Sequence, residues 1–159
     1  MSNRTDKDNY YLDIAQAVAE RSTCLRRQYG AIIVKNDEII STGYNGAPRG
    51  RRNCCDLGRC TREELRIPSG QRYELCRSVH AEANAIISAS RNRMIGSTLY
   101  LVGIDAKSGE ILSEATPCSM CRRLIINAGV KNVVARTGDG TVIDTSVQEW
   151  IVHDDTKEE

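Results

Sequence analysis

The stretch PCSMCRRLIINAGVKNVVA, residues 117–135, decides the fold, because a helix and a strand follow each other in it without a linker. Residues 118–128 predict the helix, and Gly129 is its expected C-terminal cap. Residues 130–135 predict the strand, and residues 98–104 (TLYLVGI) predict a buried strand before this unit. A helix between two buried strands predicts an α/β fold with a mixed sheet covered by helices.

The segments on the N-terminal side extend this pattern. Residues 10–22 (YYLDIAQAVAERS) have the apolar spacing of an amphipathic helix. Residues 31–34 and 38–41 are apolar runs separated by the turn residues 35–37, which predicts a β-hairpin. Residues 80–91 (HAEANAIISASR) predict another helix. The expected order is therefore helix, two strands, long loop, helix, strand, helix, strand.

Three regions carry weaker signals. Residues 44–78 contain four of the seven cysteines and no periodic pattern, so we expect a long loop that is functional or pinned by something. Residues 142–152 predict one more short element, and the acidic residues 154–159 are expected to fray. Because the length fits one complete core, we expect residues 1–159 to form a single domain.

The composition gives no reason to expect nucleic acid or a membrane surface as partner, because the net charge is only +1. No apolar run approaches the ~18 residues of a spanning helix, and residues 1–10 lack the apolar core of a secretory signal. We therefore expect a cytoplasmic protein. In that reducing compartment the seven cysteines are metal ligands, nucleophiles or buried thiols rather than disulfides.

Two motifs carry chemistry, and each opens a predicted helix. The first holds His80 and Glu82, and the second, Pro-Cys-x-x-Cys, holds Cys118 and Cys121. The two cysteines share one helical face, and a helix N-terminus favours their thiolate forms. One nitrogen and two sulfurs suit zinc, and three protein ligands leave a fourth position for water, as in catalytic sites. Glu82 is placed to hydrogen-bond that water without binding the metal.

This H-x-E…P-C-x-x-C pattern resembles the signature of the zinc nucleobase deaminases. The resemblance implies hydrolytic deamination, in which a zinc-activated hydroxide attacks C4 of a cytosine ring. Glu82 is the expected proton shuttle, which takes the water proton, protonates N3 and then protonates the leaving amine. Ammonia departs, and no organic cofactor is required.

Further stretches resemble the deoxycytidylate (dCMP) deaminase family. They are residues 43–50 (GYNGAPRG), 53–56 (NCCD), 30–34 (GAIIV) and 125–129 (IINAG), and the resemblance covers residues 10–136. It implies a three-layer, cytidine-deaminase-like fold with about five strands and helices on both faces. It also implies conversion of dCMP to dUMP and ammonia.

The resemblance also implies substrate contacts. In that family the asparagine that matches Asn45 contacts the nucleotide, and the surrounding turn, with Tyr44 and Gly46, helps to form the pocket. We expect Ala81 to line the same pocket. Arg26 is the first candidate for the phosphate, because relatives often have polar or basic residues there and Arg suits bidentate phosphate contact. Alternative phosphate candidates are Arg27, Arg49, Arg51 and Arg52.

The chain also departs from simpler family members. Residues 105–110 form a polar insertion between the strand and the Pro-Cys-x-x-Cys motif, and residues 107–110 (KSGE) predict a turn. The region after Arg136 matches the family weakly, and in related deaminases that region can reach the substrate. The exact nucleotide is therefore left open, with CMP, dCTP and modified dCMP beside dCMP.

Five cysteines outside the catalytic motif suggest a second, structural zinc. Some dCMP deaminases hold one here, and Cys24 and the Cys54–Cys55 pair look like cysteines of such members. Cys60 and Cys76 would complete a tetrahedral set of four thiolates, with only one of the pair needed. Free buried thiols are the alternative, and the sequence leaves both open.

Related enzymes imply a homo-oligomer with possible dCTP and dTTP effectors. Arg91 lies where some members make subunit contacts, although its favoured role is that of a surface charge capping a helix.

Two other functions share the motifs. A tRNA adenosine deaminase would lack the G-Y-N-G-x-P-x-G pattern and would have a more basic surface. A non-catalytic zinc or nucleotide-binding protein would have no use for Glu82.

Overall fold

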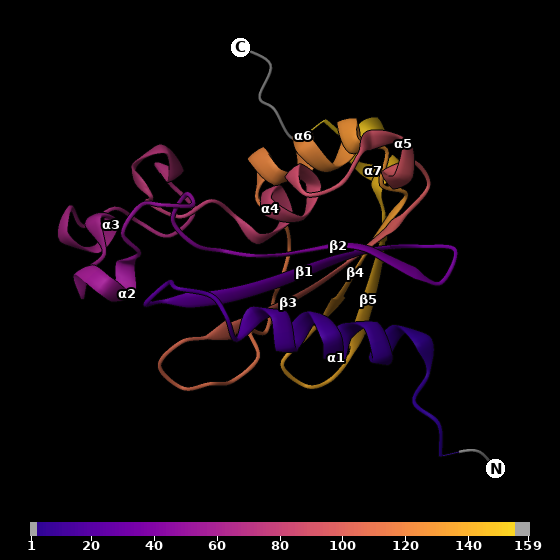
Figure 1. Ribbon diagram of the computed structural model, residues 1–159, viewed down its shortest axis with the longest axis horizontal. Helices are drawn as coiled ribbons and strands as arrows, with labels where there is room; N and C mark the ends of the chain where they lie inside the picture. The colour runs from indigo at the N-terminus through magenta and orange to yellow at the C-terminus, as the bar shows by residue number, and fades with distance from the viewer. Residues whose placement is uncertain (1–2, 155–159) are drawn as a thin grey trace.

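The computed structural model describes residues 3–154, which form a five-stranded mixed sheet between two layers of helices (Figure 1). The strand order is β2-β1-β3-β4-β5, in which β3 and β4 are parallel and all other neighbours are antiparallel. The strands are β1 (Arg27–Lys35), β2 (Glu38–Tyr44), β3 (Thr98–Asp105), β4 (Asn132–Arg136) and β5 (Val142–Ser146). The predicted α/β class, with about five strands and helices on both faces, is confirmed.

Strand β1 of the predicted hairpin contributes side chains to the hydrophobic core on both faces of the sheet. Successive side chains of a strand point to opposite faces. Ala31 and Ile33 accordingly belong to one core cluster, whereas Ile32 and Val34 belong to the other. The predicted turn is present, with Asn36 and Asp37 both at positive φ, as a tight two-residue hairpin turn requires.

Among the helices of residues 3–154, α1 (Lys7–Ala19) is the only one that covers its face of the sheet. Its buried residues include Tyr11, Leu12, Ala15 and Ala19, which pack on the strands. Gly30 of β1 permits this close approach, because a Cβ atom there would lie 2.0 Å from the carbonyl oxygen of Ala15.

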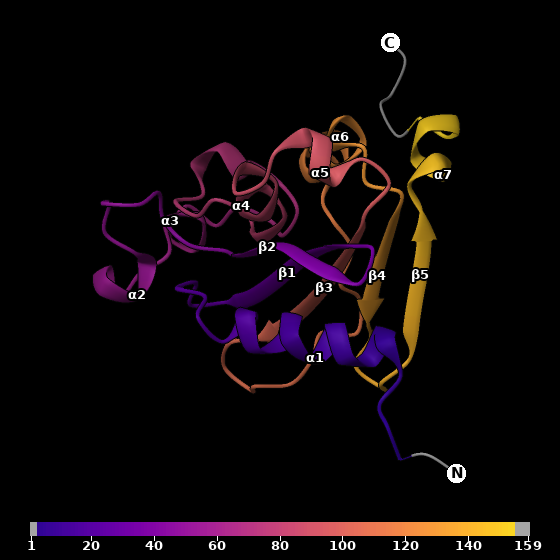
Figure 2. The same ribbon diagram turned by 45° about the vertical axis from the view of Figure 1, so that its right-hand side comes forward.

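The opposite face carries α4 (Ala81–Ile87), α5 (Arg91–Met94), α6 (Ser119–Ala128) and α7 (Val147–Val152) (Figure 2). Helix α4 sits directly on the hairpin, because a Cβ atom at Gly43 would lie 2.3 Å from the carbonyl oxygen of Ala81. The Ser41 hydroxyl donates to the Ala85 carbonyl at 2.7 Å, and the Asn84 amide donates to the Tyr44 carbonyl at 2.8 Å. These contacts fix the start of α4 relative to β2.

The prediction of one helix over residues 80–91 is wrong. Helix α4 ends at Ile87, and a separate helix begins at Arg91. The Ser88 hydroxyl donates to the Asn84 carbonyl, so this side chain competes for a helix carbonyl. Ser90, the N-cap of α5, has extended backbone angles, which interrupt a continuous helix. Arg91 therefore opens α5 instead of ending α4, and its Nε donates to the Asn127 carbonyl at the end of α6 at 2.9 Å.

The segment 44–78 is more structured than a loop. It contains α2 (Cys54–Leu57), α3 (Thr61–Glu64) and a 3-10 turn, η1 (Tyr73–Leu75). These elements are one turn long, too short to give a periodic apolar pattern. They project beyond one end of the sheet (Figure 1).

The C-terminal region contains two elements where the sequence predicted one. Strand β5 pairs with β4, and α7 follows it at once. The predicted turn in the polar insertion is present, because the Asp105 carboxylate accepts hydrogen bonds from the Lys107 and Ser108 amides. Of the tail expected to fray, Asp154 is exposed and residues 155–159 lie outside the described range. Among the described residues, no helix combines the length and apolarity that crossing a bilayer needs.

Candidate metal centre and pocket

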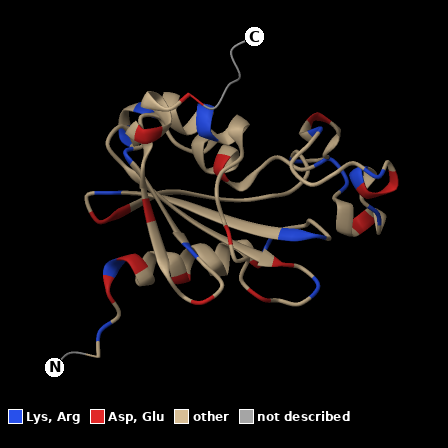
Figure 3. Cartoon of the chain, turned by 180° about the vertical axis from the view of Figure 1, so that it is seen from behind, with Lys and Arg blue, Asp and Glu red and all other residues tan. Residues whose placement is uncertain are grey.

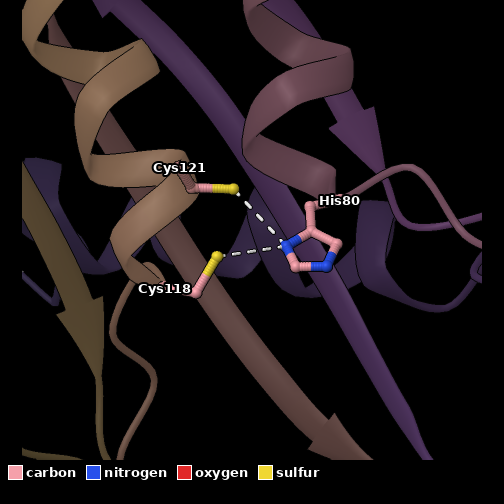
Figure 4. Close-up of side chains that lie close together, drawn as sticks. All are labelled: His80, Cys118 and Cys121. Carbon is pink, nitrogen blue, oxygen red and sulfur yellow. Dashed lines mark hydrogen bonds between the residues drawn. The ribbon is translucent and has the colours of Figure 1, made fainter. Parts of the chain in front are cut away.

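Three potential metal ligands converge from the starts of two helices. His80 is the N-cap of α4, Cys118 is the N-cap of α6, and Cys121 lies in the first turn of α6. The His80 Nδ1 atom lies 3.5 Å from Cys118 Sγ and 3.4 Å from Cys121 Sγ (Figure 4). These ligand atoms all lie within 4.8 Å of one another. The structure thus brings together the three residues that the motifs single out.

The chemistry of this donor set fits zinc. Hydrogen bonds from Cys121 and from His80 lower the pKa of the Cys118 thiol. A helix N-terminus adds to this preference for thiolate. Two thiolates and one imidazole are ligands that zinc accepts, and three protein ligands are the number typical of its catalytic sites.

Glu82 is buried beside these ligands, with 5% of its surface exposed. Burial raises the pKa of its carboxyl above the ordinary value. A carboxyl group with a raised pKa holds a proton more readily, which suits general acid–base catalysis, in which one group both accepts and returns a proton.

A pocket opens onto the candidate metal centre. His80, Glu82 and Cys118 form part of its lining. Most other lining residues are polar or charged, and they come from the start of β1, the end of β2 and segment 60–78. They include Arg26, Arg27, Tyr29, Asn45, Arg62 and Tyr73.

Asn45 lines the pocket and hydrogen-bonds to the backbone of β1. Its Oδ1 accepts a hydrogen bond from the Tyr29 amide at 2.8 Å, and its Nδ2 donates to the Arg27 carbonyl at 2.9 Å. An amide side chain offers two donor hydrogens and two acceptor lone pairs, so one of each is left for a ligand. Asn45 can therefore brace the pocket and still contact a substrate.

Comparison with known proteins identifies the family. A family model described as the cytidine and deoxycytidylate deaminase zinc-binding region matches residues 5–137. The chain belongs to this family. The resemblance drawn from the motifs is thereby confirmed, and the family's zinc-binding description agrees with the His80, Cys118 and Cys121 cluster.

Several relatives are named deoxycytidylate deaminase. The one from Mycobacterium phage D29 is 38% identical over 136 residues, which are 83% of this chain and 95% of the relative. The one from Schizosaccharomyces pombe is 34% identical over 134 residues, which are 84% of this chain but only 38% of the relative. The chain therefore spans nearly all of the phage relative and well under half of the yeast one.

Solved structures agree with the fold. The apo dCMP deaminase from cyanophage S-TIM5 is 29% identical, with a TM-score of 0.57 and 84% of each chain covered. The same phage enzyme has a structure in complex with dCMP and dUMP, at a TM-score of 0.55, 27% identity and 84% coverage of each chain. A cytidine deaminase from Burkholderia pseudomallei, 19% identical at a TM-score of 0.57, shares the fold and covers 99% of this chain.

The remaining predicted substrate residues of this deaminase-family chain take different places. Arg26 lines the pocket, but its Nε lies 3.1 Å from a carboxylate oxygen of Glu63. Ala81, the first residue of α4, is fully buried and is not among the residues that line the pocket. Tyr44 and Gly46 line a second hollow, and the Gly46 backbone pairs with Val79. Their expected substrate contacts stay predictions.

Several pocket residues of this family member were not predicted from the sequence, among them Arg62, Tyr73 and Tyr29. Arg62 and Tyr73 lie in segment 60–78, where no periodic pattern singles them out. Tyr29 lies two residues from Arg27 on β1, on the face that α4 and α6 cover, so the alternation of the strand could have found it. None of the lining residues comes from the described part of the chain after Cys118.

Four of the five other cysteines gather near the pocket. Burial raises the pKa of the Cys54 thiol, and the neighbouring Cys24, Cys60 and Cys76 thiols raise it further. Cys24, Cys60 and Cys76 also line the pocket. Cys55, by contrast, is exposed.

Charges of both signs are spread along the loops and helix ends of this family member (Figure 3). Lys and Arg number 22 against 21 Asp and Glu. An extended single-sign stripe, such as nucleic-acid-binding proteins use to follow a phosphate backbone, is not the pattern that Figure 3 displays for the described residues.

Proposed function

We propose that this chain hydrolyses dCMP to dUMP and ammonia. The observation that carries this proposal is a buried carboxyl, Glu82, next to a His-Cys-Cys ligand set in a pocket lined by arginines and Asn45. Relatives named deoxycytidylate deaminase, at up to 38% identity among those compared, support dCMP as the substrate.

The chemistry divides between the metal and Glu82. Zinc, when bound to His80, Cys118 and Cys121, supplies a nucleophile at neutral pH from water. Glu82 takes the proton that this water loses and delivers it to N3 of the cytosine ring. The C4–O bond forms in the same stage, so C4 becomes tetrahedral. Glu82 then carries the second water proton to the 4-amino group, and the C4–N bond breaks with release of ammonia.

The pocket arginines fit a nucleotide rather than a nucleoside. Arg26 has 29% of its side chain exposed and pairs with Glu63, so a phosphate would have to compete with that carboxylate. Arg27 lies beside it at the start of β1, close enough to Tyr29 to oppose the rise that burial causes in the tyrosine pKa. We therefore assign the phosphate to Arg26 and Arg27 jointly.

A structural zinc is the second part of the proposal. The nearby Cys24, Cys60 and Cys76 thiols each raise the pKa of the Cys54 thiol, which supports the four as one set, and the exposure of Cys55 favours Cys54 from the adjacent pair. Four thiolates are a common structural zinc set. Such an ion would tie segment 54–76 to the start of β1. We also propose a cytoplasmic location, because a reducing compartment keeps cysteines available as metal ligands.

Regulation and assembly stay proposals. The second hollow, lined by Tyr44 and Gly46 together with Arg21, Arg49 and Arg51, has the charge to hold the phosphates of dCTP or dTTP. Exposed apolar side chains on α4 and α6, Ile87, Met120 and Leu124, support a homo-oligomer. Light scattering with and without dCTP tests both.

The substrate is tested with a panel of candidates. Zinc-loaded protein is incubated separately with dCMP, CMP, dCTP, 5-methyl-dCMP and a tRNA anticodon stem-loop, and ammonia release is followed. Turnover of dCMP above the others supports the proposal. Turnover of the stem-loop alone would favour a tRNA adenosine deaminase, and turnover of another cytosine nucleotide would move the assignment to it. Binding of dCMP without any turnover, even with dCTP present, would favour a non-catalytic nucleotide-binding protein.

A further inference from the structure

Arg62 is a buried charge in the pocket wall. Only 7% of its surface is exposed. Its Nε donates to the Gln71 carbonyl at 3.2 Å, and its Nη2 donates to the Pro68 and Gln71 carbonyls at 3.1 and 2.8 Å. A buried guanidinium is costly unless its donors are used, and here the carbonyls of segment 66–72 use them. Arg62 therefore holds this segment in place.

Tyr73 lies between Arg62 and the candidate metal centre. The Arg62 guanidinium stands over the Tyr73 ring, with its central carbon 4.6 Å from the ring centroid. The Tyr73 ring meets the His80 ring at 87°, with the two centroids 5.0 Å apart. Both rings line the pocket and are nearly perpendicular, so they form an aromatic corner next to the metal ligands.

We propose that Tyr73 is the substrate-binding residue against which the pyrimidine ring packs, and that Arg62 is the positioning residue that holds Tyr73 there. This inference rests on the proposed hydrolysis of dCMP. A ring whose C4 reacts beside His80 would lie in the pocket that Tyr73 and His80 both line. Stacking of a base on an aromatic side chain contributes to the affinity for a nucleotide, and this contribution does not depend on hydrogen bonds.

Three substitutions test the Tyr73 hydroxyl, the Tyr73 ring and the Arg62 guanidinium separately. The contacts of Tyr73 with Arg62 and His80 are ring contacts, so Tyr73→Phe preserves them. Tyr73→Leu keeps apolar bulk and removes the aromatic face. Arg62→Lys keeps the positive charge, but an ammonium lacks the planar fork that reaches the Pro68 and Gln71 carbonyls together.

The experiment uses zinc-loaded full-length protein and measures KM and kcat for dCMP, the Kd of the product dUMP by calorimetry, and bound zinc. Tyr73→Phe is expected to stay within about twofold of wild type in KM and Kd. Tyr73→Leu is expected to raise both by about 10-fold with unchanged zinc and a smaller change in kcat. Arg62→Lys is expected to raise KM and Kd by less than Tyr73→Leu does. The double variant with both substitutions is expected to have the same KM and Kd as Tyr73→Leu alone.

Two results would overturn the inference. One is Tyr73→Leu with wild-type KM and dUMP Kd. The other is a loss of zinc in Tyr73→Leu that accounts for the whole effect, which would make Tyr73 a support of His80 only. A wild-type protein that binds dUMP but does not turn over dCMP points instead to failure of the proposed function, and the Kd series still tests Tyr73. A wild-type protein that neither binds dUMP nor hydrolyses dCMP overturns both.

Discussion

At the residue scale, the burial of Glu82 determines what it can do. A carboxyl with 5% of its surface exposed has few water molecules to stabilise its negative charge. The resulting rise in its pKa makes it a better proton acceptor than a surface carboxylate. Its position in the first turn of α4, two residues after His80, brings this property next to the metal ligands.

Adjacent cysteines give a prediction about the second metal. We expect Cys54→Ser to remove one of two zinc ions per chain, because Cys54 is the buried member of the thiol cluster. Cys55→Ser is the matched control, and it should keep both ions because Cys55 is exposed. Zinc per chain, measured by mass spectrometry of the metal, decides between them. One zinc in the wild-type protein would contradict the second site.

The choice between Cys54 and Cys55 also marks the limit of sequence reasoning for single residues. The two are neighbours in the chain, and only the one-turn helix α2 turns one inward and the other out. The ion pair between Arg26 and Glu63 was likewise hidden, because its partners lie 37 positions apart (63 − 26). The catalytic ligands were predictable because fixed spacings at helix starts require no knowledge of the loop between them.

At the element scale, two glycines set how closely helices approach the hairpin from opposite faces. Gly30 faces α1 and Gly43 faces α4, and a Cβ atom added at these positions would lie 2.0 and 2.3 Å, respectively, from helix backbone. Neither backbone can give way as a flexible side chain would. Any residue larger than Gly must therefore push a helix off the sheet.

This arrangement predicts different outcomes for two matched substitutions. Gly30→Ala and Gly43→Ala should both lower the free energy of unfolding, by about 1–3 kcal/mol or more, in urea titrations. Only Gly43→Ala should also weaken zinc binding, because α4 begins at His80 and carries Glu82. Competition with a zinc chelator measures that affinity. Equal zinc affinities in the two variants would show that the placement of α4 does not control the metal centre.

The hydrogen bond between α1 and the β1–β2 turn predicts that the free energy of unfolding depends on pH. The Tyr11 hydroxyl donates to the Asp37 carboxylate, which raises the pKa of Tyr11 from 10.0 to about 12. The folded protein therefore keeps a proton that the unfolded chain loses above pH 10. The stabilisation by this bond should be complete below pH 10 and lost as the pH rises to about 12.

Tyr11→Phe is the control for this effect. Urea titrations of both proteins at several pH values should give a stability difference that is constant up to pH 10 and shrinks toward pH 12. A difference that stays constant across this window would mean that the bond to Asp37 does not stabilise the fold.

Element type was predictable where periodicity runs over several residues, as in β1, β3 and α6. The break between α4 and α5 was not, because it depends on the hydrogen bond from Ser88 to the Asn84 carbonyl and on the extended backbone of Ser90, which a pattern of apolar residues does not record. The part of the pocket wall formed by Arg62 and Tyr73 was not predicted either, because backbone carbonyls and one-turn elements leave no periodic pattern in the sequence.

At the scale of the whole molecule, metal ligands connect segments that are distant in sequence. The catalytic set joins α4 to α6, and the proposed thiol set joins the start of β1 to segment 54–76. A ligand that binds only the folded state stabilises it, by about 2.7 kcal/mol at a concentration 100 times its Kd. The two ions should therefore stabilise the protein as a whole.

Removal of zinc with a chelator is accordingly expected to lower Tm, by ~5–10 °C per fully bound ion for a domain of this size. Re-addition of zinc should restore the value. The variant Cys118→Ser should show only the part of this decrease in Tm that loss of the catalytic ion causes. An unchanged Tm after verified metal removal would contradict a stabilising role.

We propose that Glu82 moves the protons in zinc-assisted hydrolysis of dCMP. The most direct measurement is dUMP formation from dCMP by zinc-loaded wild type and by Glu82→Gln, with bound zinc and dUMP affinity determined for both. We predict that wild type forms dUMP, and that Glu82→Gln keeps its zinc and its dUMP affinity while its rate falls by about 10²–10⁴-fold. A Glu82→Gln protein that keeps the wild-type rate would contradict this role of Glu82, and a zinc-loaded wild type that forms no dUMP would contradict the assigned reaction.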